Sequence, residues 1–97
     1  PSNACLATRI PYGSEITAEK LDQIDRAESK LRKLGYAGFR VRHHGDIARI
    51  ESKAEDMKNI IENRKEIIDS FEGLGFTYVA LDLEGYRTGS LNEKLDG

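Results

Sequence analysis

Several residue types are scarce in this chain of 97 residues, which has one cysteine, no tryptophan and two prolines. The single cysteine, Cys5, cannot by itself build a disulfide framework, a zinc finger or an iron–sulfur site, and it indicates a reducing compartment. No apolar run approaches the ~20 residues that a membrane span needs. The formal net charge of −2 argues against a broad nucleic-acid-binding surface, although it leaves room for a local basic patch.

The remaining composition, 38% hydrophobic and 33% charged, is typical of one small folded domain. The chain starts at Pro1 and its most distinctive segment follows at once, at Cys5. We therefore expect residues 1–97 to be a single C-terminal domain of a larger protein whose N-terminal portion is missing here. Within it, residues 1–16 are predicted to be a linker and motif segment, and residues 17–90 a compact core.

Helical periodicity is clearest over residues 17–34. Thr17 is a suitable N-cap, and Gly35 follows the last apolar residue as a C-cap glycine should. Three- and four-residue spacing puts one set of apolar side chains on a single face: Leu21, Ile24, Ala27, Leu31 and Leu34.

Residues 38–51 are predicted to form a hairpin around Gly45 and Asp46. Phe39 and Val41 alternate with Arg40 and Arg42, and the second run continues from Ile47. If Phe39 and Val41 face the core with Ala48 and Ile50, the opposite face carries the charged side chains Arg40, Arg42, Arg49 and Glu51. His43 and His44 are adjacent, so a regular strand would point them to opposite faces.

The second half of the chain predicts two short helices and a strand. The spacing of Ser52 and Glu55 is that of a capping box, and Asn63 with Glu66 repeats it, so a break is expected near Glu62. We expect Ile60, Ile61, Ile67, Ile68 and Phe71 to face inward. Residues 76–81 are rich in strand formers. The fold class is thus α+β, with a small mixed sheet, the order α-β-β-α-β and helices packed on one side.

Cys5 is the first candidate for chemistry. A lone cysteine is usually a buried small hydrophobe, but polar and turn-forming residues surround this one. Arg9 lies nearby in sequence, and a neighbouring cation favours the reactive thiolate.

Arg40 and Arg42 form the second candidate site. Alternation along a strand places them on the same side, where paired guanidiniums suit a phosphate or a carboxylate. The alternative is a solvated strand face with ordinary salt bridges.

Glu28 is the third, because helical projection places it inside the apolar stripe of residues 17–34. A carboxylate there must pair with another group, bind a metal or extend to solvent at the edge of the apolar stripe. An ion pair is the general expectation. Glu51, on the arginine-bearing face of the hairpin, is a candidate companion metal ligand.

Three motifs taken together resemble a known family. They are CLATRIPYG (residues 5–13), RVRHHGDIARIE (residues 40–51) and LDLEGYRTGS (residues 81–90). The chain resembles, over about residues 4–93, the C-terminal portion of the LarE-type, ATP-dependent sacrificial sulfur transferases of the PP-loop (N-type ATP pyrophosphatase) superfamily.

The resemblance implies a two-part enzyme. A PP-loop domain, which lies outside this sequence, would bind ATP with Mg²⁺ and adenylylate a carboxylate of a pyridinium mononucleotide on the route to the nickel-pincer cofactor. The family's sulfur-donating cysteine matches Cys5, and its paired phosphate-binding arginines match Arg40 and Arg42. Its metal-binding carboxylates match Glu28 and Glu51. Relatives that use three cysteines and a [4Fe-4S] cluster also exist, and with Cys5 alone this chain favours the sacrificial type without a cluster.

Other interpretations stay open. The chain could be a noncatalytic substrate-binding or oligomerisation module of a PP-loop ligase or amidotransferase, or a small RNA-binding domain with a basic face. The net charge and the core-like positions of the aromatic residues disfavour RNA binding. We expect a cytoplasmic protein whose partners are the mononucleotide and its own PP-loop domain, with no membrane partner. A homo-oligomer and a bound divalent metal are left open, and the isolated chain is expected to be inactive.

Overall fold

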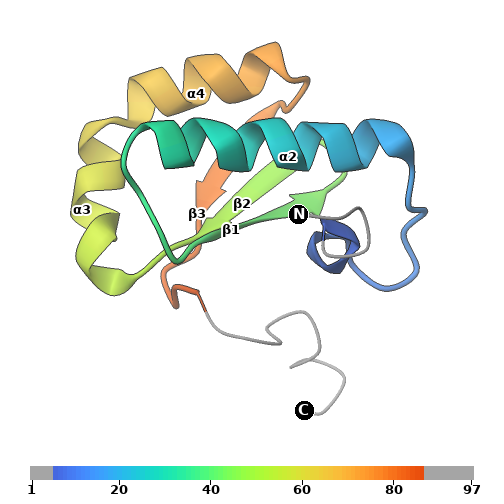
Figure 1. Ribbon diagram of the computed structural model, residues 1–97, viewed down its shortest axis with the longest axis horizontal. Coiled ribbons are helices and arrows are strands. Elements are labelled where there is room, and N and C mark those ends of the chain that lie inside the picture. Colours follow the sequence, from blue (N-terminus) through green and yellow to red (C-terminus); the bar gives the residue numbers. More distant parts are fainter. Residues whose placement is uncertain (1–5, 87–97) are drawn as a thin grey trace.

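A three-stranded sheet with helices on one side forms the fold (Figure 1). The computed structural model describes residues 6–86. In chain order the elements are the short 3-10 helix η1 (Ala7–Arg9), α2 (Ala18–Lys33), β1 (Arg40–His44), β2 (Ile47–Glu51), α3 (Ala54–Glu62), α4 (Arg64–Gly73) and β3 (Tyr78–Leu81). Strand β2 is central; it pairs antiparallel with β1 and parallel with β3. The predicted class and element order are confirmed.

Helix α2 begins and ends where local chemistry predicts. The Thr17 hydroxyl accepts a hydrogen bond from the Lys20 backbone N–H at 3.1 Å, which caps the first turn. At the other end Gly35 has φ of 101°, and the N–H of Tyr36 returns to the Leu31 carbonyl. Together with the Gly35 N–H bonded to Arg32, this is a Schellman motif.

Helix α4 ends in the same motif, built from another Leu-Gly-aromatic triplet. Gly75 has φ of 105°, and the N–H of Phe76 bonds to the carbonyl of Phe71. The likeness between residues 34–36 and 74–76 therefore reflects a shared way of terminating a helix.

The hairpin has the two predicted faces. Arg40 lies opposite Glu51 and Arg42 opposite Arg49, so these four residues occupy one face of the sheet. Val41 pairs with Ile50 on the other face, which α2 and α4 cover. The sheet thus separates an apolar layer from a charged one.

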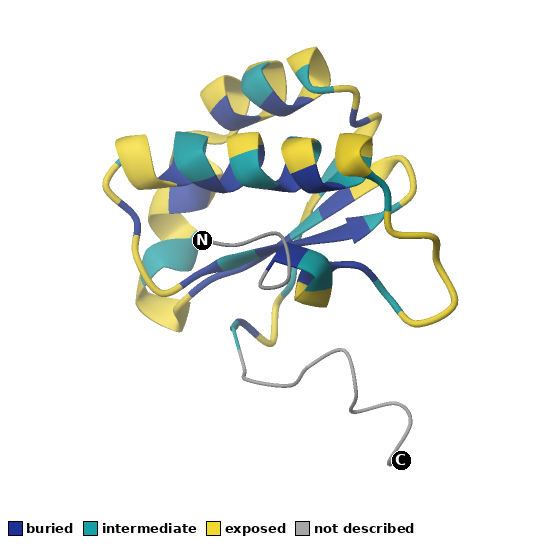
Figure 2. Cartoon of the chain, turned by 45° about the vertical axis from the view of Figure 1, so that its right-hand side comes forward, coloured by how far each residue is buried: buried dark blue, intermediate teal, exposed yellow. Residues whose placement is uncertain are grey.

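The apolar layer lies between the helices and the sheet, where the buried residues in Figure 2 face one another. Its buried residues come from α2, β1, β2, α3, α4 and the connecting segments, and they are Ala27, Leu31, Tyr36, Phe39, Val41, Ala48, Ile50, Ile60, Ile67, Phe71 and Phe76. Strand β3 adds the partly buried Val79 and Leu81. A second, smaller cluster joins η1 to α2 through Leu6, Ile10, Leu21 and Ile24. That second cluster holds the motif segment against the first long helix.

Several local predictions were wrong. Helix α3 starts one residue later than the capping box implied, with Lys53 at the N-cap and no side-chain cap; the Ser52 hydroxyl bonds to the Lys53 carbonyl instead. Asn63 caps nothing either, because its amide donates to Tyr36 and Asn59.

Two side chains and one strand end also differ from expectation. Ile61 and Ile68 were expected to face inward, yet they are 50% and 36% exposed, because Ile60 and Ile67 occupy the inward positions of these short helices. Strand β3 starts at Tyr78, because Phe76 is used in the helix-ending motif of α4 and in the core.

Candidate functional site

Glu28, on the inner face of α2, forms a buried ion pair with Arg9 of η1. The Arg9 Nε lies 3.1 Å from Glu28 Oε2, and Arg9 Nη2 lies 3.2 Å from Oε1, so the contact is bidentate. Glu28 is 2% exposed. Its Oε2 also accepts a hydrogen bond from the Val41 N–H at 3.0 Å, and so satisfies a backbone donor on the outer edge of β1. This ion pair explains why a carboxylate lies within the apolar face of α2.

Glu51 forms a second buried group on the charged face of the sheet. It is fully buried, and its Oε1 accepts from Arg42 Nε at 3.0 Å while its Oε2 accepts from Arg49 Nη1 at 2.7 Å. Arg49 also pairs with Asp82 after β3 and donates from Nε to His44 Nε2. Two arginines and two carboxylates therefore balance one another across the three strands.

Thr8 connects the two groups. Its hydroxyl accepts from Arg9 Nη1 at 2.9 Å, and its backbone carbonyl accepts from Arg42 Nη1 at 3.2 Å. The segment that follows Cys5 in sequence is thereby attached both to α2 and to the charged face of the sheet. The Cys5 prediction itself lies outside the described residues.

Arg40 differs from the other arginines of this face. Its Nη1 donates to the Phe39 carbonyl at 2.8 Å, and its Cζ lies 4.9 Å from the ring centroid of Tyr86. No carboxylate of the described residues 6–86 lies within ion-pair distance of it. The Arg40 guanidinium therefore stacks on an aromatic ring, and no carboxylate of residues 6–86 neutralises its charge.

Arg40 and Arg42 thus lie on one face of the sheet, as predicted, and hydrogen bonds to protein groups hold each guanidinium in place. Arg42 uses Nε and Nη1 for Glu51 and Thr8, and within the described part of the chain its Nη2 has no protein partner. Such an arrangement leaves N–H groups of both arginines for an oxyanion. Arg49 lies on the predicted charged face, whereas Tyr86 and Thr8 were not predicted as partners of these arginines, because each comes from a segment distant in sequence.

The structure places Glu28 and Glu51 in separate ion-pair groups. Both carboxylates already accept from arginines, and the described residues contain no cluster of three or more side chains of the metal-binding types. This donor set does not favour a divalent ion between them. Their assignment as metal ligands stays a prediction.

His43 faces the apolar layer, beneath α2. Gln23 Nε2 donates to the Leu74 carbonyl at 2.8 Å, which turns Gln23 Oε1 toward His43 Nε2 at 2.9 Å, so the imidazole donates. The His43 ring also packs against Phe76, with centroids 5.4 Å apart. Burial lowers the pKa of His43 below its ordinary value, and the charges of Lys20 and His44 lower it further.

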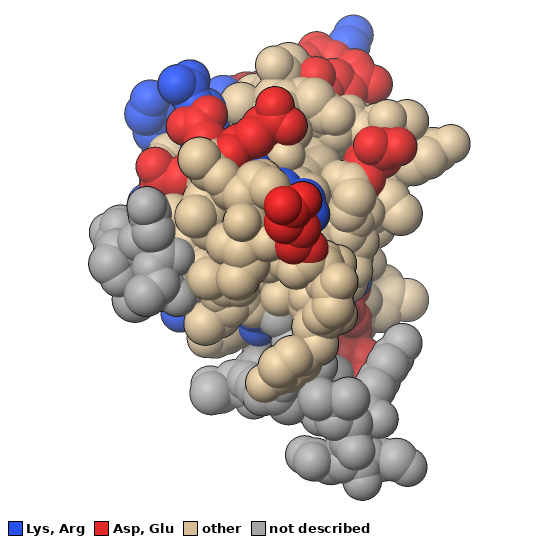
Figure 3. All heavy atoms as spheres, turned by 90° about the vertical axis from the view of Figure 1, so that its right-hand side faces the viewer, with Lys and Arg blue, Asp and Glu red and all other residues tan. Residues whose placement is uncertain are grey.

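Surface charge is distributed differently from the buried charge. On the face that Figure 3 shows, acidic side chains are scattered among uncharged ones, and basic atoms appear only in small groups. Arg9 and Arg42 are buried, so they contribute little to any surface field.

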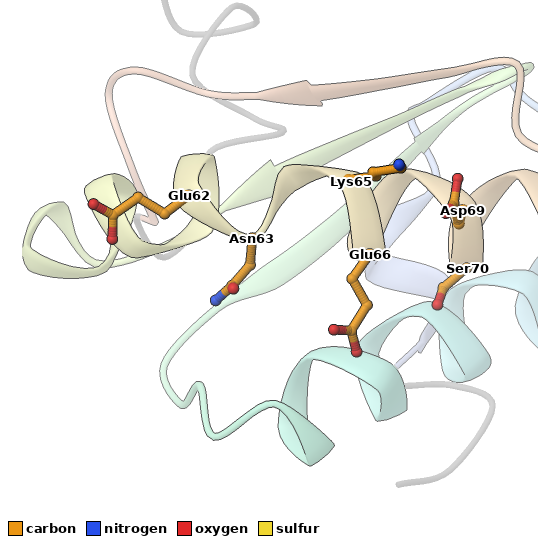
Figure 4. Close-up of a pocket in the computed structure, with 6 residues that line it drawn as sticks. All are labelled: Glu62, Asn63, Lys65, Glu66, Asp69 and Ser70. Carbon is orange, nitrogen blue, oxygen red and sulfur yellow. The ribbon is translucent and has the colours of Figure 1, made fainter.

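A shallow hollow at the α3–α4 junction offers no convergent chemistry. It is lined by Glu62, Asn63, Lys65, Glu66, Asp69 and Ser70. Figure 4 shows these side chains leaving the helices in different directions, and Glu66 is already paired with Lys30 at 2.8 Å. The site is therefore placed on the arginine face of the sheet.

Comparison with known proteins supports the resemblance. No protein-family model matches the chain. It is 37% identical over 94 residues to the pyridinium-3,5-bisthiocarboxylic acid mononucleotide synthase of Lactiplantibacillus plantarum, a LarE-type protein, with 97% of this chain and 34% of the synthase covered. Similarity to this synthase is shown, while the ATP-dependent sacrificial chemistry and the PP-loop assignment stay predictions.

Two further relatives are uncharacterized proteins. One, from Synechocystis sp., is 46% identical over 97 residues, covering 98% of this chain and 36% of the relative. The other, from Methanocaldococcus jannaschii, is 38% identical over 88 residues, covering 91% of this chain and 34% of the relative. The chain spans about a third of the length of the curated relatives it matches.

Within residues 6–86, none of the helices has the length and apolar character required to cross a bilayer.

Replacing Glu28 tests the buried ion pair. Glu28→Gln removes the negative charge from the buried pair with Arg9 and should lower the free energy of unfolding by about 3–5 kcal/mol. The matched control is Asp22→Asn, which breaks an exposed pair with Arg26 and should cost under ~1 kcal/mol. Denaturant unfolding measures both. Equal costs for the two variants would contradict the account of a desolvated pair.

The depressed pKa of His43 predicts the direction of a pH effect. The unfolded chain binds a proton at His43 as pH falls through about 6.5, whereas the folded chain resists it. The free energy of unfolding should therefore be highest above that pH and should decline as the pH falls below it. His43→Gln should flatten the change in unfolding free energy between about pH 7.5 and 5.5. His44→Gln is the comparison variant: it removes only the smallest cause of the lowered pKa of His43 and leaves its burial intact, so it should keep most of the slope. An unchanged slope in His43→Gln would refute the assignment.

Proposed function

We propose that this chain is the portion of an ATP-dependent sulfur transferase that binds a pyridinium mononucleotide substrate and donates sulfur to it from Cys5. The supporting observation is the pair of anchored arginines, Arg40 and Arg42, on one face of β1. Similarity to the Lactiplantibacillus plantarum synthase over 97% of the chain supports the same class of substrate.

The arginine pair is suited to the phosphate of the mononucleotide. Arg40 carries a positive charge that no described carboxylate neutralises. The Arg42 side chain is only 6% exposed, but its orientation is fixed, and its Nη2 has no protein partner within residues 6–86. Anchoring removes side-chain freedom before the ligand arrives, so less entropy is lost on binding. A guanidinium also offers two parallel N–H donors to a phosphate.

The position of Thr8 supports the placement of the sulfur donor near the pair Arg40 and Arg42, the proposed phosphate clamp. Cys5 is three residues before Thr8 in the sequence, and such a stretch spans at most about 11 Å when extended. Because the Thr8 carbonyl is bonded to Arg42, the covalent chain limits how far the thiol can lie from a phosphate held there.

The proposed reaction has two stages at Cys5. The thiolate attacks the adenylylated carboxyl carbon of the substrate, forming a carbon–sulfur bond and releasing AMP. A base then removes the Cα proton of Cys5, and the Cβ–sulfur bond breaks. The sulfur leaves with the substrate as a thiocarboxylate, and dehydroalanine stays at position 5. ATP and Mg²⁺ would bind in the PP-loop domain, outside this chain.

The alternative is a noncatalytic substrate-binding module. Intact-mass measurement of the full-length protein separates the two proposals after incubation with ATP, Mg²⁺ and pyridinium-3,5-biscarboxylic acid mononucleotide. Sulfur donation should lower the mass of the protein by that of one H₂S, and Cys5→Ala should show neither the loss nor thiocarboxylate product. Product formed with Cys5 unchanged would refute sulfur donation.

The clamp is tested by binding. Arg40→Ala in the full-length protein should weaken binding of the mononucleotide by about 2–5 kcal/mol, because the phosphate loses a charged partner. Arg40→Lys should rescue only part of the loss, since an ammonium lacks the guanidinium fork. Arg42→Ala should act similarly, although it also leaves Glu51 with one arginine fewer.

The matched control is Arg26→Ala, which removes an exposed arginine of α2. It should leave the affinity for the mononucleotide unchanged, and all of these variants should bind ATP normally. Titrations in which Arg40→Ala and Arg42→Ala match the wild-type protein would remove the clamp.

A further inference from the structure

We propose that Tyr86 is a positioning residue for Arg40, one that orients the guanidinium for phosphate without neutralising it. The inference rests on the proposed function, since it assumes that Arg40 contacts the mononucleotide phosphate. The observation that supports it is the position of Arg40 Cζ over the Tyr86 ring, 4.9 Å from the ring centroid.

The stack differs chemically from the other arginine contacts of this face. Arg9, Arg42 and Arg49 each pair with carboxylates, which occupy N–H donors and cancel charge. An aromatic face holds a guanidinium through its π cloud and leaves the in-plane N–H edges available. Arg40 can therefore be fixed in orientation and still present a full positive charge to an oxyanion.

The chain delivers Tyr86 to this position through a tight contact with the end of β2. The Tyr86 N–H donates to the Ser52 carbonyl at 2.9 Å, and Ser52 follows Glu51, the cross-strand partner of Arg40. The ring is thus held beside Arg40 by a backbone contact on the neighbouring strand.

Gly85 makes that contact sterically feasible. It has φ of 85°, and a Cβ placed on it would lie 2.8 Å from the Ser52 carbonyl oxygen and 3.4 Å from Met57 Cε. Any larger residue must therefore displace the Tyr86 backbone from Ser52. The dipeptide Gly85-Tyr86 acts as one unit, with the glycine permitting the approach and the ring orienting Arg40.

Binding of a phosphorylated ligand and its unphosphorylated form tests the role in the full-length protein. The probes are pyridinium-3,5-biscarboxylic acid mononucleotide and the corresponding nucleoside. Tyr86→Leu, which keeps apolar bulk, should weaken mononucleotide binding about 3- to 10-fold and leave nucleoside binding unchanged. Tyr86→Phe keeps the ring and should retain wild-type affinity.

Two further substitutions separate orientation from folding. Replacing Tyr86 with pentafluorophenylalanine keeps the ring shape but reverses its electrostatic face, so it should reproduce the loss seen in Tyr86→Leu even if the leucine variant folds poorly. Gly85→Ala should give the same phosphate-specific loss, whereas Gly73→Ala, which meets no atom within 4 Å and lacks a positive φ, should not.

The Arg40→Ala background makes the outcomes distinguishable. If Tyr86 acts through Arg40, adding Tyr86→Leu to Arg40→Ala causes no further loss. Unchanged mononucleotide binding in Arg40→Ala would overturn the proposed function itself. A loss in Arg40→Ala with wild-type affinity in Tyr86→Leu and in the pentafluoro variant would overturn only the role of Tyr86. Equal weakening of mononucleotide and nucleoside would likewise overturn it, by showing a structural effect.

Discussion

The rest of the structure depends on the burial of two glutamates, Glu28 and Glu51, each of which needs arginine partners. An unpaired buried carboxylate costs several kcal/mol, so the partners must be in place for the fold to form. Arg9 comes from η1 and Arg42 from β1, and Thr8 accepts from both. The requirement to neutralise two charges thereby fixes the motif segment, the first long helix and the sheet relative to one another.

This constraint explains why the arginines divide into two kinds. Arg9, Arg42 and Arg49 satisfy buried carboxylates, and their positions are set by that structural need. Arg40 lies on the same face but rests on Tyr86, and its charge is not cancelled by any carboxylate described here. Within residues 6–86, the paired arginines are therefore fixed by buried carboxylates, whereas Arg40 is held by an aromatic ring that leaves its charge in place.

Local sequence patterns predicted the helices and strands well, but they failed where a side chain could form its hydrogen bonds either locally or with a residue distant in sequence. Apolar spacing identified α2, and strand alternation identified the hairpin face that carries Arg40 and Glu51. The cap assigned to Asn63 failed because its amide bonds with Tyr36, a residue distant in sequence. Capping motifs describe only local competition for hydrogen bonds, so a tertiary partner can override them.

The sequence by itself determined the helix ends with glycine, the two faces of the hairpin and the burial of Glu28, because each follows from backbone geometry or from periodicity. Only the tertiary structure decided which groups met: Arg9 with Glu28, Arg49 with Asp82, and Arg40 with Tyr86. These pairs join segments separated by 19 to 46 residues. Ionic and aromatic contacts have no sequence period, so their partners are set by how the helices and strands pack.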